Sequence, residues 1–295
     1  MAIERTAMVT IAGRPNVGKS TLCNALVGEK IAIVSPKPQT TRNRIIGVVN
    51  DDETQIVLVD TPGFHKARNK LGNYMIKVVR ESLEDTDCIL MIVEPKPERT
   101  PSEETLIEKI EASGLPCVLA INKIDTLPKE RILAVIASYA ERFEFDAIIP
   151  ISAKKRDGLE LLLEQLKTYA VEGAQLFPED MITDQPERHI AAEILREKMM
   201  LCLDDEIPHG VAVETASFKE REDGVVDLEF NIYCEKSTHK SIIIGKNGEM
   251  LKKISSMARP EIERMLDAKV FMRTWVKPKD NWRESDYLVR NFGYE

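Results

Sequence analysis

The chain has 295 residues, 43% of them hydrophobic and 31% charged, which predicts about two soluble domains with sizeable cores. Intrinsic disorder and collagen are excluded, and no apolar run approaches the roughly 20 residues of a membrane-spanning helix. The net charge of −8 argues against a general nucleic-acid binder. The charge is uneven, however. Residues 179–229 carry 5 basic and 15 acidic side chains, whereas residues 240–279 carry 10 basic and 4 acidic ones, which predicts an anion-facing surface in the second stretch.

Five cysteines, an odd number without any CxxC pair, are typical of a reducing compartment. We expect them to be small buried hydrophobic side chains. The N-terminus shows no separate apolar segment with a cleavage site, so we expect no export signal and a cytoplasmic location.

Residues 1–172 alternate strand-like apolar runs with longer amphipathic stretches, which predicts an α/β domain built on a parallel sheet wrapped by helices. The expected strands are 7–12, 45–49, 55–60, 88–94, 117–122 and 147–151. The expected helices are 18–26, 70–83, 102–112, 129–143 and 159–169.

A segment with glycine, two prolines and acidic residues, 173–186, predicts a linker to residues 187–295. After it we expect a helix at 189–203, two strands at 211–218 and 225–234 that turn at Asp223-Gly224, helices at 248–257 and 260–266, and a strand at 270–276. The order α-β-β-α-α-β describes a smaller α+β domain, followed by a C-terminal tail.

A glycine-rich segment lies between the first expected strand and the first expected helix. Its pattern GxxxxGK[ST] predicts a phosphate-binding loop, because glycines let backbone amides turn toward phosphate oxygens and the helix adds partial positive charge. Lys19 would reach the β- and γ-phosphates, and the Ser20 hydroxyl would ligate Mg²⁺. The alternative is a chance match in an ordinary strand-turn-helix. The predicted nucleotide-binding residues here are Gly13, Arg14, Pro15, Asn16, Val17, Gly18, Lys19, Ser20 and Thr21.

Two further motifs, residues 60–63 and residues 122–125, each end a later strand of the same predicted sheet. In the first, Asp60 would hold the Mg²⁺ shell and Gly63 would approach the γ-phosphate. In the second, a buried Asp125 would favour guanine over adenine, because only guanine offers the N1 and N2 donors that such a carboxylate needs. The nucleotide-binding residues predicted from these strand ends are Asp60, Thr61, Pro62, Gly63, Phe64, Asn122, Lys123, Asp125, Ser152, Ala153 and Lys154.

These motifs, in this order, resemble the translation-factor-related P-loop GTPases, which include the Era-like group. The resemblance implies a mixed, mostly parallel sheet and GTP hydrolysis that depends on Lys19, Thr41, Asp60 and Gly63. In this class a loop after the first helix carries a Mg²⁺-binding threonine. We favour Thr41 for that role, with Thr40 as the alternative. The matching switch I segment comprises Gln39, Thr40, Thr41, Arg42 and Asn43.

Phe64 stands where many GTPases have a glutamine that orients the attacking water. An apolar ring makes no such hydrogen bond, so we expect slow intrinsic turnover. Some Era-like relatives recruit K⁺ through an asparagine that matches Asn16, which implies a K⁺ site beside the Mg²⁺ site here. The alternative is that Asn16 only shapes the loop. Residues 64–70, with Arg68 and Lys70, are expected to form a second nucleotide-sensitive segment.

A second glycine loop precedes a pair of lysines near the end of the chain. GxxG between two helices, the α-β-β-α-α-β order and the basic stretch resemble a KH domain of the second topological type, which implies binding of single-stranded RNA. An ordinary glycine turn with a solvated lysine face is the alternative. Phe271 and Trp275 are expected on opposite faces of their strand, so base stacking is not assured. The predicted RNA-binding residues are Ile244, Gly245, Lys246, Asn247, Gly248, Lys252 and Lys253.

A GTPase domain with one C-terminal KH domain resembles the Era-like group along nearly the whole chain. The resemblance implies binding of GTP, GDP and the 3′ end of 16S rRNA, a role in assembly of the small ribosomal subunit, and control of RNA binding by nucleotide state. It also implies peripheral contact with the inner membrane, and we expect no stable oligomer. The competing hypotheses are a membrane-associated signalling GTPase with a protein effector, and an RNA-binding module with GTP as a structural ligand.

Overall fold

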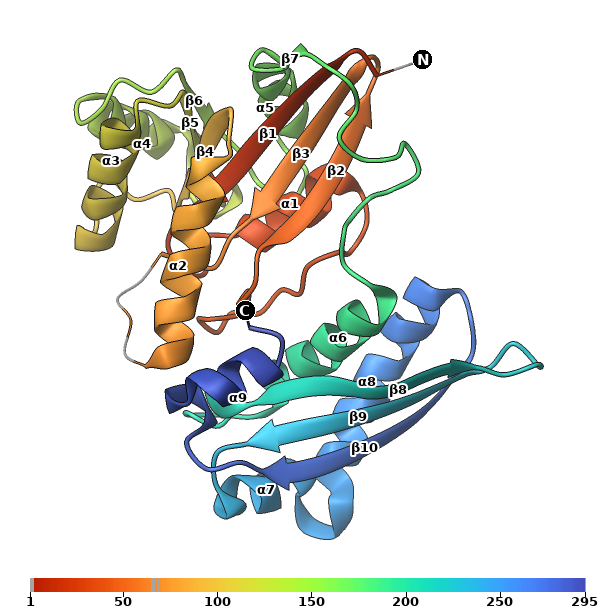
Figure 1. Cartoon of the computed structure of the whole chain (residues 1–295). Coiled ribbons are helices and arrows are strands. Elements are labelled where there is room, and N and C mark those ends of the chain that lie inside the picture. The colour runs from red at the N-terminus through yellow and green to blue at the C-terminus, as the bar shows by residue number, and fades with distance from the viewer. Residues whose placement is uncertain (1–2, 65–66, 68, 295) are drawn as a thin grey trace. The chain divides into compact units, whose positions relative to one another are not determined.

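The computed structural model describes residues 3–64, 67 and 69–294. The chain divides into two units (Figure 1). The first contains residues 1–32, 41–66 and 75–184, and the second contains residues 33–40, 67–74 and 185–295. The two short segments of the second unit, 33–40 and 67–74, therefore come from the N-terminal half of the sequence.

The first unit is built on a sheet with the strand order β2-β3-β1-β4-β5-β6. Neighbouring strands on this path are parallel except β2, which is antiparallel to β3, and a short β7 pairs antiparallel with β1. The sheet is therefore mixed and mostly parallel. The strands are β1 (Arg5–Ala12), β2 (Ile45–Asp51), β3 (Thr54–Asp60), β4 (Cys88–Val93), β5 (Cys117–Ile121), β6 (Ala147–Pro150) and β7 (Val171–Glu172).

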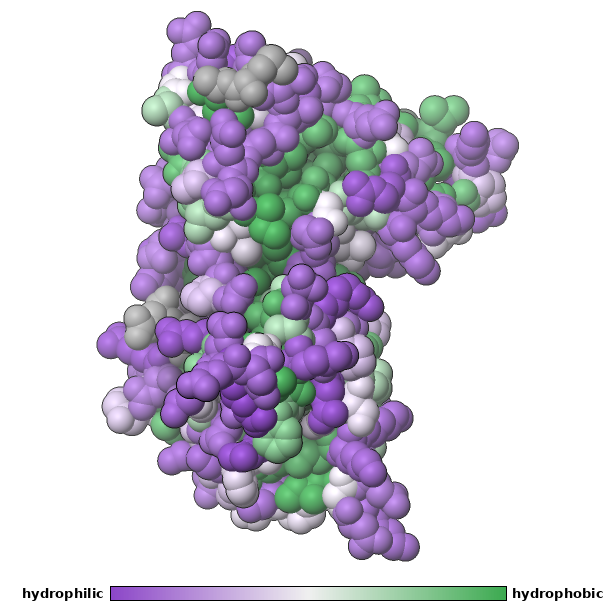
Figure 2. Space-filling model, turned by 90° about the vertical axis from the view of Figure 1, so that its right-hand side faces the viewer, coloured by the Kyte–Doolittle hydropathy of each residue, from purple (hydrophilic) through white to green (hydrophobic). Residues whose placement is uncertain are grey.

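Helices cover both faces of this sheet, because alternate residues of its central strands belong to two different cores. Leu90 and Ile92 of β4 pack in one core with α1 and α5, whereas Ile89 and Met91 pack in the other with α3 and α4. The helices are α1 (Lys19–Val27), α2 (Lys70–Glu84), α3 (Pro101–Ser113), α4 (Lys129–Ala140) and α5 (Leu159–Lys167). On the side of the molecule that Figure 2 shows, hydrophilic side chains predominate and hydrophobic ones gather in patches between them.

The segment predicted as a linker, 173–186, lies in part along the edge of the sheet (Figure 1). The backbone amide of Val48 in β2 donates to the carbonyl of Ile182 (2.9 Å), and Asn50 Nδ2 donates to the carbonyl of Glu179 (2.9 Å). The buried Gln55 of β3 accepts from two backbone amides, those of Leu176 and Phe177. This stretch is therefore an ordered cover for the edge strand β2.

The second unit contains a three-stranded sheet in the order β10-β9-β8, in which β8 is antiparallel and β10 parallel to β9. Alternate residues of β9, from Val226 to Cys234, are buried with α6, α7 and α8 in one core. The other face of the sheet carries the remaining residues. The elements are α6 (Glu187–Cys202), β8 (Ala212–Glu220), β9 (Val226–Cys234), α7 (Ser237–Ile244), α8 (Glu249–Leu266), β10 (Val270–Pro278) and α9 (Asp286–Asn291).

The structure corrects the expected helices of this unit. One continuous α8 replaces the two helices expected at 248–257 and 260–266, with Pro260 inside it, and α7, for which we gave no range, precedes the glycine loop. Pro260 and Ser256 are both exposed, so the carbonyl that loses its helical partner at Pro260 lies on the solvent side. The expected C-terminal tail includes α9, and Trp282 near it is fully buried.

Candidate functional site

The glycine-rich loop between β1 and α1 needs its glycines because other backbone atoms approach it closely. A Cβ atom on Gly13 would lie 2.5 Å from the carbonyl oxygen of Ile92, and one on Gly18 would collide with the side-chain amide of Asn122. Gly18 also has a φ of 104° and Asn16 a φ of 66°, both in the left-handed region. The loop thus has the conformation that lets successive amides face an anion at the start of α1.

Lys19 is buried inside this loop. Its Nζ donates hydrogen bonds to the carbonyl oxygens of Gly13 (3.2 Å) and Arg14 (3.0 Å). Burial lowers the pKa of Lys19 to about 8, although the nearby Asp60 carboxylate acts in the opposite direction. A buried ammonium group forms stronger hydrogen bonds with a charged acceptor than with neutral carbonyl oxygens. Lys19 is therefore placed to bind a phosphate.

Ser20, Thr41 and Asp60 converge beside Lys19. Ser20 Oγ donates to Asp60 Oδ2 (2.6 Å) and lies 2.8 Å from Thr41 Oγ1, which lies 3.5 Å from the same carboxylate oxygen. Burial raises the pKa of Asp60 to about 6, and among the described residues Asp60 Oδ1 has no hydrogen-bond partner. Two hydroxyls and a buried carboxylate form the hard oxygen set that Mg²⁺ prefers. The hydroxyl of Thr40 instead donates to the carbonyl of Lys37 (2.7 Å), so the geometry favours Thr41.

The residues expected around the base are tied directly to the phosphate loop. Asn122 Nδ2 donates to the carbonyl of Val17 (2.9 Å), and Asn122 Oδ1 accepts from the amide of Ala153 (3.0 Å). Lys123 Nζ donates to the carbonyl of Asn16 (2.6 Å). Base and phosphate loops therefore form one hydrogen-bonded unit.

Asp125 is exposed, whereas we expected it to be buried. The Ser152 hydroxyl donates to its Oδ1 (2.6 Å) and is the main reason that the pKa of Asp125 is lowered. A hydrogen bond from the backbone of Asp125 itself also lowers this pKa, so the protein favours the ionised carboxylate. The expectation was wrong because it assumed the environment that a bound base would create.

Two acidic residues of this site escaped the sequence analysis. Glu94 Oε1 accepts from Lys123 Nζ (2.7 Å), and its other oxygen lies 3.6 Å from Arg14 Nη2. The buried Glu103 accepts from Arg14 Nε (3.0 Å) and also caps α3 together with Thr100. Glu94 follows β4 at the carboxyl edge of the sheet, a position that could have identified it, whereas Glu103 reads only as a helix-capping residue.

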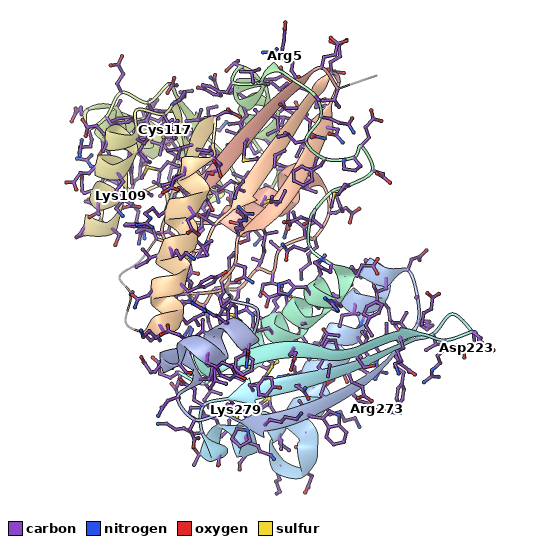
Figure 3. The ribbon with its side chains drawn as sticks, in the orientation of Figure 1. Arg5, Lys109, Cys117, Asp223, Arg273 and Lys279 are labelled. Atoms are coloured by element: carbon purple, nitrogen blue, oxygen red, sulfur yellow. The ribbon has the colours of Figure 1, made fainter. Side chains whose placement is uncertain are left out.

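Residues 61–64 follow β3, and two of them contact different parts of the unit: Gly63 lies against the phosphate loop and Phe64 against the core. Thr61 is buried and donates to the carbonyl of Ile11 (2.8 Å), and a Cβ atom on Gly63 would lie 2.7 Å from Pro15 Cα. The ring of Phe64 packs against the core under α3, with Lys109 Nζ 4.9 Å from the ring centroid; Figure 3 labels Lys109. No polar group of this ring can orient water. Arg68, expected in the second nucleotide-sensitive segment, lies outside the described residues.

The remaining predicted residues around the nucleotide site have mixed environments. Arg42 is buried and Asn43 half-buried, while Gln39 has a φ of 61°. Thr21 is half-buried in α1, and Lys154 is exposed after β6. Pro62 is buried.

The second glycine loop joins α7 to α8 and is open to solvent. Gly245, Asn247 and Gly248 have φ values of 76°, 52° and 80°. A Cβ atom on Gly245 would lie 2.7 Å from Met250 Cβ, whereas one on Gly248 would meet nothing within 4 Å. Ile244 is half-buried, and the predicted basic residues are exposed around the start of α8, namely Lys246, Lys252 and Lys253. This is an accessible, positively charged helix start that suits a phosphate backbone.

Phe271 and Trp275 lie on the same face of β10, and our expectation of opposite faces was wrong. Side chains alternate along a strand, so residues four apart share a face. Both rings are exposed, at 44% and 57%.

The fold and these two loops define a P-loop GTPase domain followed by a KH domain. The model of the 50S ribosome-binding GTPase family matches residues 8–123, and that of the KH domain matches residues 206–283. GTPase Era of Ruminiclostridium cellulolyticum is 53% identical over 291 residues, covering 99% of this chain and 98% of that protein. GTPase Era of Clostridium kluyveri is 47% identical and covers 99% of each. The chain belongs to the Era family of GTPases and is a GTP-hydrolysing enzyme.

Solved structures agree with this assignment. Era in complex with MgGDPNP and nucleotides 1506–1542 of 16S ribosomal RNA is 39% identical, with a TM-score of 0.95 and 99% coverage of both chains. A variant of Aquifex aeolicus Era bound to GDP·AlF4⁻ has the same identity and TM-score, with 98% of this chain and 99% of that chain covered. Within the described residues, no helix is both long and apolar enough to cross a membrane.

Proposed function

We propose that this GTPase binds the 3′ end of 16S rRNA through its KH domain during assembly of the small ribosomal subunit, under control of the bound nucleotide. The RNA in the complex of the related Era supports the ligand. The observation that carries nucleotide control is that the second unit includes residues 33–40, which end directly before Thr41, the threonine that we propose as a Mg²⁺ ligand.

Residues 33–40 are held by charged groups of α6. The backbone amide of Val34 donates to Glu197 Oε1 (2.8 Å), and Arg196 Nη2 donates to the carbonyl of Thr40. Lys37 Nζ donates to the carbonyl of Leu203 at the end of α6. A movement of Thr41 toward or away from a γ-phosphate would therefore act on α6 through these contacts.

Three consecutive charged residues of α6 are buried: Arg196, Glu197 and Lys198, at 0%, 3% and 5% exposure. Successive side chains on a helix point about 100° apart, so α6 must be enclosed on most sides where these residues lie. Lys198 Nζ contacts both Glu197 Oε2 and Glu261 Oε1 of α8, each at 2.5 Å. Since α8 begins at the RNA-binding glycine loop, this network connects residues 33–40 to the helix that would hold RNA.

The second segment, 67–74, is held in the same unit by the C-terminal region. Lys70 Nζ lies 3.1 Å from Asp286 Oδ2, and the rings of Tyr74 and Tyr294 are 6.1 Å apart. Residues 33–40 and 67–74, which flank nucleotide motifs in the sequence, thus belong to the unit that carries the KH domain. Loops ordered by a γ-phosphate and released after hydrolysis are a general switching mechanism of GTPases.

For the nucleotide itself, we propose that Ser20, Thr41 and Asp60 hold Mg²⁺ and that Asp125 accepts hydrogen bonds from guanine. A bound Mg²⁺ would neutralise charge on the β- and γ-phosphates. We also propose a K⁺ site at Asn16. The ring of Phe64 packs into the core and cannot take part in hydrolysis through hydrogen bonds. A K⁺ ion at Asn16 would add positive charge near the β- and γ-phosphates.

The test is RNA binding by the full chain with a GTP analogue, with GDP and without nucleotide, using an RNA that matches nucleotides 1506–1542. We expect different affinities in the three states, and weak binding in all of them for Lys246→Glu/Lys252→Glu. That variant should keep its GTP affinity. Equal affinities in the three states would leave the enzyme but remove the switch, and an unchanged affinity of the lysine variant would reject the RNA loop.

We further propose a cytoplasmic location, which rests on the cysteine pattern, and peripheral contact with the inner membrane, which rests on the family resemblance. We also propose that the protein forms no stable oligomer. Co-sedimentation with small ribosomal subunits would support the ribosomal role. Exclusive recovery with membranes would favour the alternative, a signalling GTPase with a protein effector.

A further inference from the structure

Among the described residues, no helix covers one face of the second unit's sheet near the β8–β9 turn, whose tip, Asp223, is labelled in Figure 3. The side chains of β9 that point away from the core are Asp227, Glu229, Asn231 and Tyr233. In the parallel neighbour β10, Phe271, Arg273 and Trp275 pair in register with the first three of these. All three residues of β10 are exposed, so two large aromatic rings with an arginine between them face solvent.

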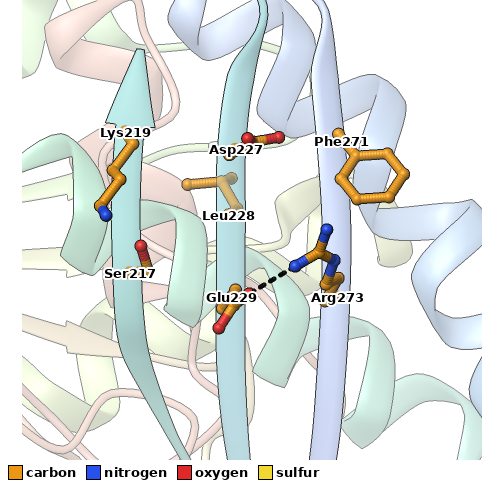
Figure 4. Close-up of a pocket in the computed structure, with 7 residues that line it drawn as sticks. All are labelled: Ser217, Lys219, Asp227, Leu228, Glu229, Phe271 and Arg273. Carbon is orange, nitrogen blue, oxygen red and sulfur yellow. Dashed lines mark hydrogen bonds and ion pairs between the residues drawn. The ribbon is translucent and has the colours of Figure 1, made fainter. Parts of the chain in front are cut away.

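Two arginines are fixed around the first of these rings. The guanidinium carbons of Arg221 and Arg273 lie 5.5 Å and 5.1 Å from the centroid of the Phe271 ring. Arg221 makes two hydrogen bonds to Asp227, at 2.8 Å and 2.5 Å, and Arg273 Nη1 donates to Glu229 Oε1 (2.9 Å; Figure 4). The carboxylates therefore orient the two guanidinium planes and have their own charge compensated.

A small hollow of about 180 Å³ opens between these side chains (Figure 4). It is smaller than the roughly 300–1,000 Å³ of sites for whole small molecules. It suits one flat group, such as a nucleobase, better than a complete metabolite. The lining residues are Ser217, Lys219, Asp227, Leu228, Glu229, Phe271 and Arg273.

The other end of the same face already carries a stacked ring from the C-terminal region. The ring of Phe292, directly after α9, lies 4.4 Å from that of Tyr233 at an interplanar angle of 25°. The sheet surface thus accommodates a planar group stacked on a strand residue. The stretch from Phe271 to Trp275 offers the same kind of surface to an external ligand.

We propose that this open face is a second contact surface for single-stranded RNA, on which unpaired bases stack over Phe271 and Trp275. The proposal rests on the proposed function of the KH domain and extends its RNA path beyond the glycine loop. Aromatic residues on an open sheet face stack two or three bases in other RNA-binding folds. The two rings are four residues apart, about 13 Å along a strand, which leaves room for separate bases.

The charges of the face favour RNA over a protein partner. Four basic side chains border the rings. The carboxylates of Asp227, Glu229 and Glu214 accept hydrogen bonds from Arg221, Arg273 and Tyr233 of this region, respectively. The centre of a protein interface is usually depleted of charge, whereas charged residues occupy the centre here. The basic residues are Lys219, Arg221, Arg273 and Lys277.

The experiment uses the full chain and two single-stranded RNAs, a 4-mer and a 12-mer that begin with the same sequence. A glycine loop of this type holds about four nucleotides, so only the 12-mer can reach both surfaces. For Phe271→Ala/Trp275→Ala we expect affinity for the 12-mer to fall about tenfold or more, with unchanged affinity for the 4-mer. Tyr287→Ala, which removes an exposed ring of α9 and none from β10, is the matched control and should bind both RNAs normally.

Tryptophan emission supplies an independent readout, because the chain has two tryptophans and Trp282 is buried. The 12-mer should quench the emission of the wild type by stacking on Trp275, and this quenching should be lost in Trp275→Phe. Equal 12-mer affinity of the double variant and the wild type would overturn the proposal, as would the absence of quenching.

Unchanged RNA binding combined with weaker association with small ribosomal subunits would assign the face to a protein and likewise overturn the proposal. Lys246→Glu/Lys252→Glu distinguishes RNA binding by the glycine loop from RNA binding by the sheet face. Loss of both RNAs in that variant supports the glycine loop regardless of the sheet face, and a wild type that binds neither RNA would refute both proposals.

Discussion

The chain contains two glycine loops that resemble each other in backbone and differ in surroundings. Each places an asparagine in the left-handed region, Asn16 at a φ of 66° and Asn247 at 52°, and each leads into a helix. The loop before α1 is enclosed by the backbone of Ile92, the side chain of Asn122 and the buried charges around Lys19. The loop before α8 is open, with room for a Cβ atom on Gly248.

The difference matches the ligands that the two loops are proposed to bind. A triphosphate has a fixed shape, so a preorganised site with buried charges gains affinity from interactions that are set before binding. A polymer contributes many similar phosphates and bases, so an exposed loop gains affinity from numerous weak, salt-dependent contacts. The enclosed loop should therefore be sensitive to single atoms and the open loop tolerant of them.

The largest effect is expected for the buried lysine of the enclosed loop. Lys19→Ala removes charge-assisted hydrogen bonds to two phosphates, so the affinity for GTP should fall by about 100-fold or more. Titration with a fluorescent GTP analogue measures this change. Lys129→Ala, an exposed lysine at the start of α4, is the control, and a similar loss in both variants would contradict a specific role for Lys19.

The same substitution in both loops tests the comparison most directly. In Gly18→Ala the new methyl group collides with Asn122. The backbone φ of 104° at this position also strains any residue with a Cβ atom, so GTP affinity should fall by at least about tenfold. In Gly248→Ala the methyl group meets only open space, so RNA affinity should change by less than about fivefold, with a destabilisation of about 1 kcal/mol from the left-handed backbone. Comparable losses of ligand affinity would mean that the two loops do not differ in the way described.

Selection of the base should depend on Asp125 and, to a smaller extent, on Ser152. Asp125→Ala removes the acceptor for two base donors, so the preference for GTP over ATP should fall by about 10- to 100-fold. Ser152→Ala removes only the hydrogen bond that orients this carboxylate and should lower the preference by about fivefold. Competition between the two nucleotides measures both values, and an unaltered preference in Asp125→Ala would place base selection elsewhere.

The network on α6 should matter for coupling and not for GTP affinity. Glu197→Gln weakens the contacts to Val34 and Lys198, so the ratio of RNA affinities in the GTP-analogue and GDP states should move toward one by about threefold or more. Glu187→Gln, an exposed residue of the same helix, is the control. A normal ratio in Glu197→Gln would remove α6 from the proposed coupling.

The smallest effect concerns the monovalent cation. If K⁺ contributes positive charge near the phosphates, turnover at saturating Mg²⁺ should be several-fold faster in K⁺ than in Na⁺. Phosphate release under multiple turnover measures the difference. Identical rates in the two salts would remove K⁺ from the proposal and leave Asn16 as a loop-shaping residue.

The order of elements in the first unit was predictable because each site motif ends a strand of strong apolar pattern. The convergence of Ser20 and Asp60 also follows from the parallel strands β1 and β3, which end at one sheet edge. Thr41 lies before the antiparallel strand β2, and its place beside them was expected only from the family resemblance. Glu103 was not predictable, because its contact with Arg14 joins residues far apart in sequence and its local pattern is fully explained by the helix cap.

The second unit shows where local patterns mislead. Pro260 suggested a helix boundary, but its exposed position lets α8 continue. The parity of Phe271 and Trp275 was misjudged, although alternation along a strand places both on one face. The burial of three consecutive charges on α6 has no local signal, since it depends on residues 33–40 and on Glu261 of α8.

The ordered stretch along β2 has a practical consequence for anyone who wishes to isolate the GTPase domain. A fragment that stops at residue 172 would remove the hydrogen bonds that Val48 and Asn50 of β2 make with Ile182 and Glu179, and would open the outer edge of this strand to a strand from another molecule. Extending the fragment to residue 184 retains that protection. The longer version should therefore stay monodisperse at concentrations where the shorter one aggregates.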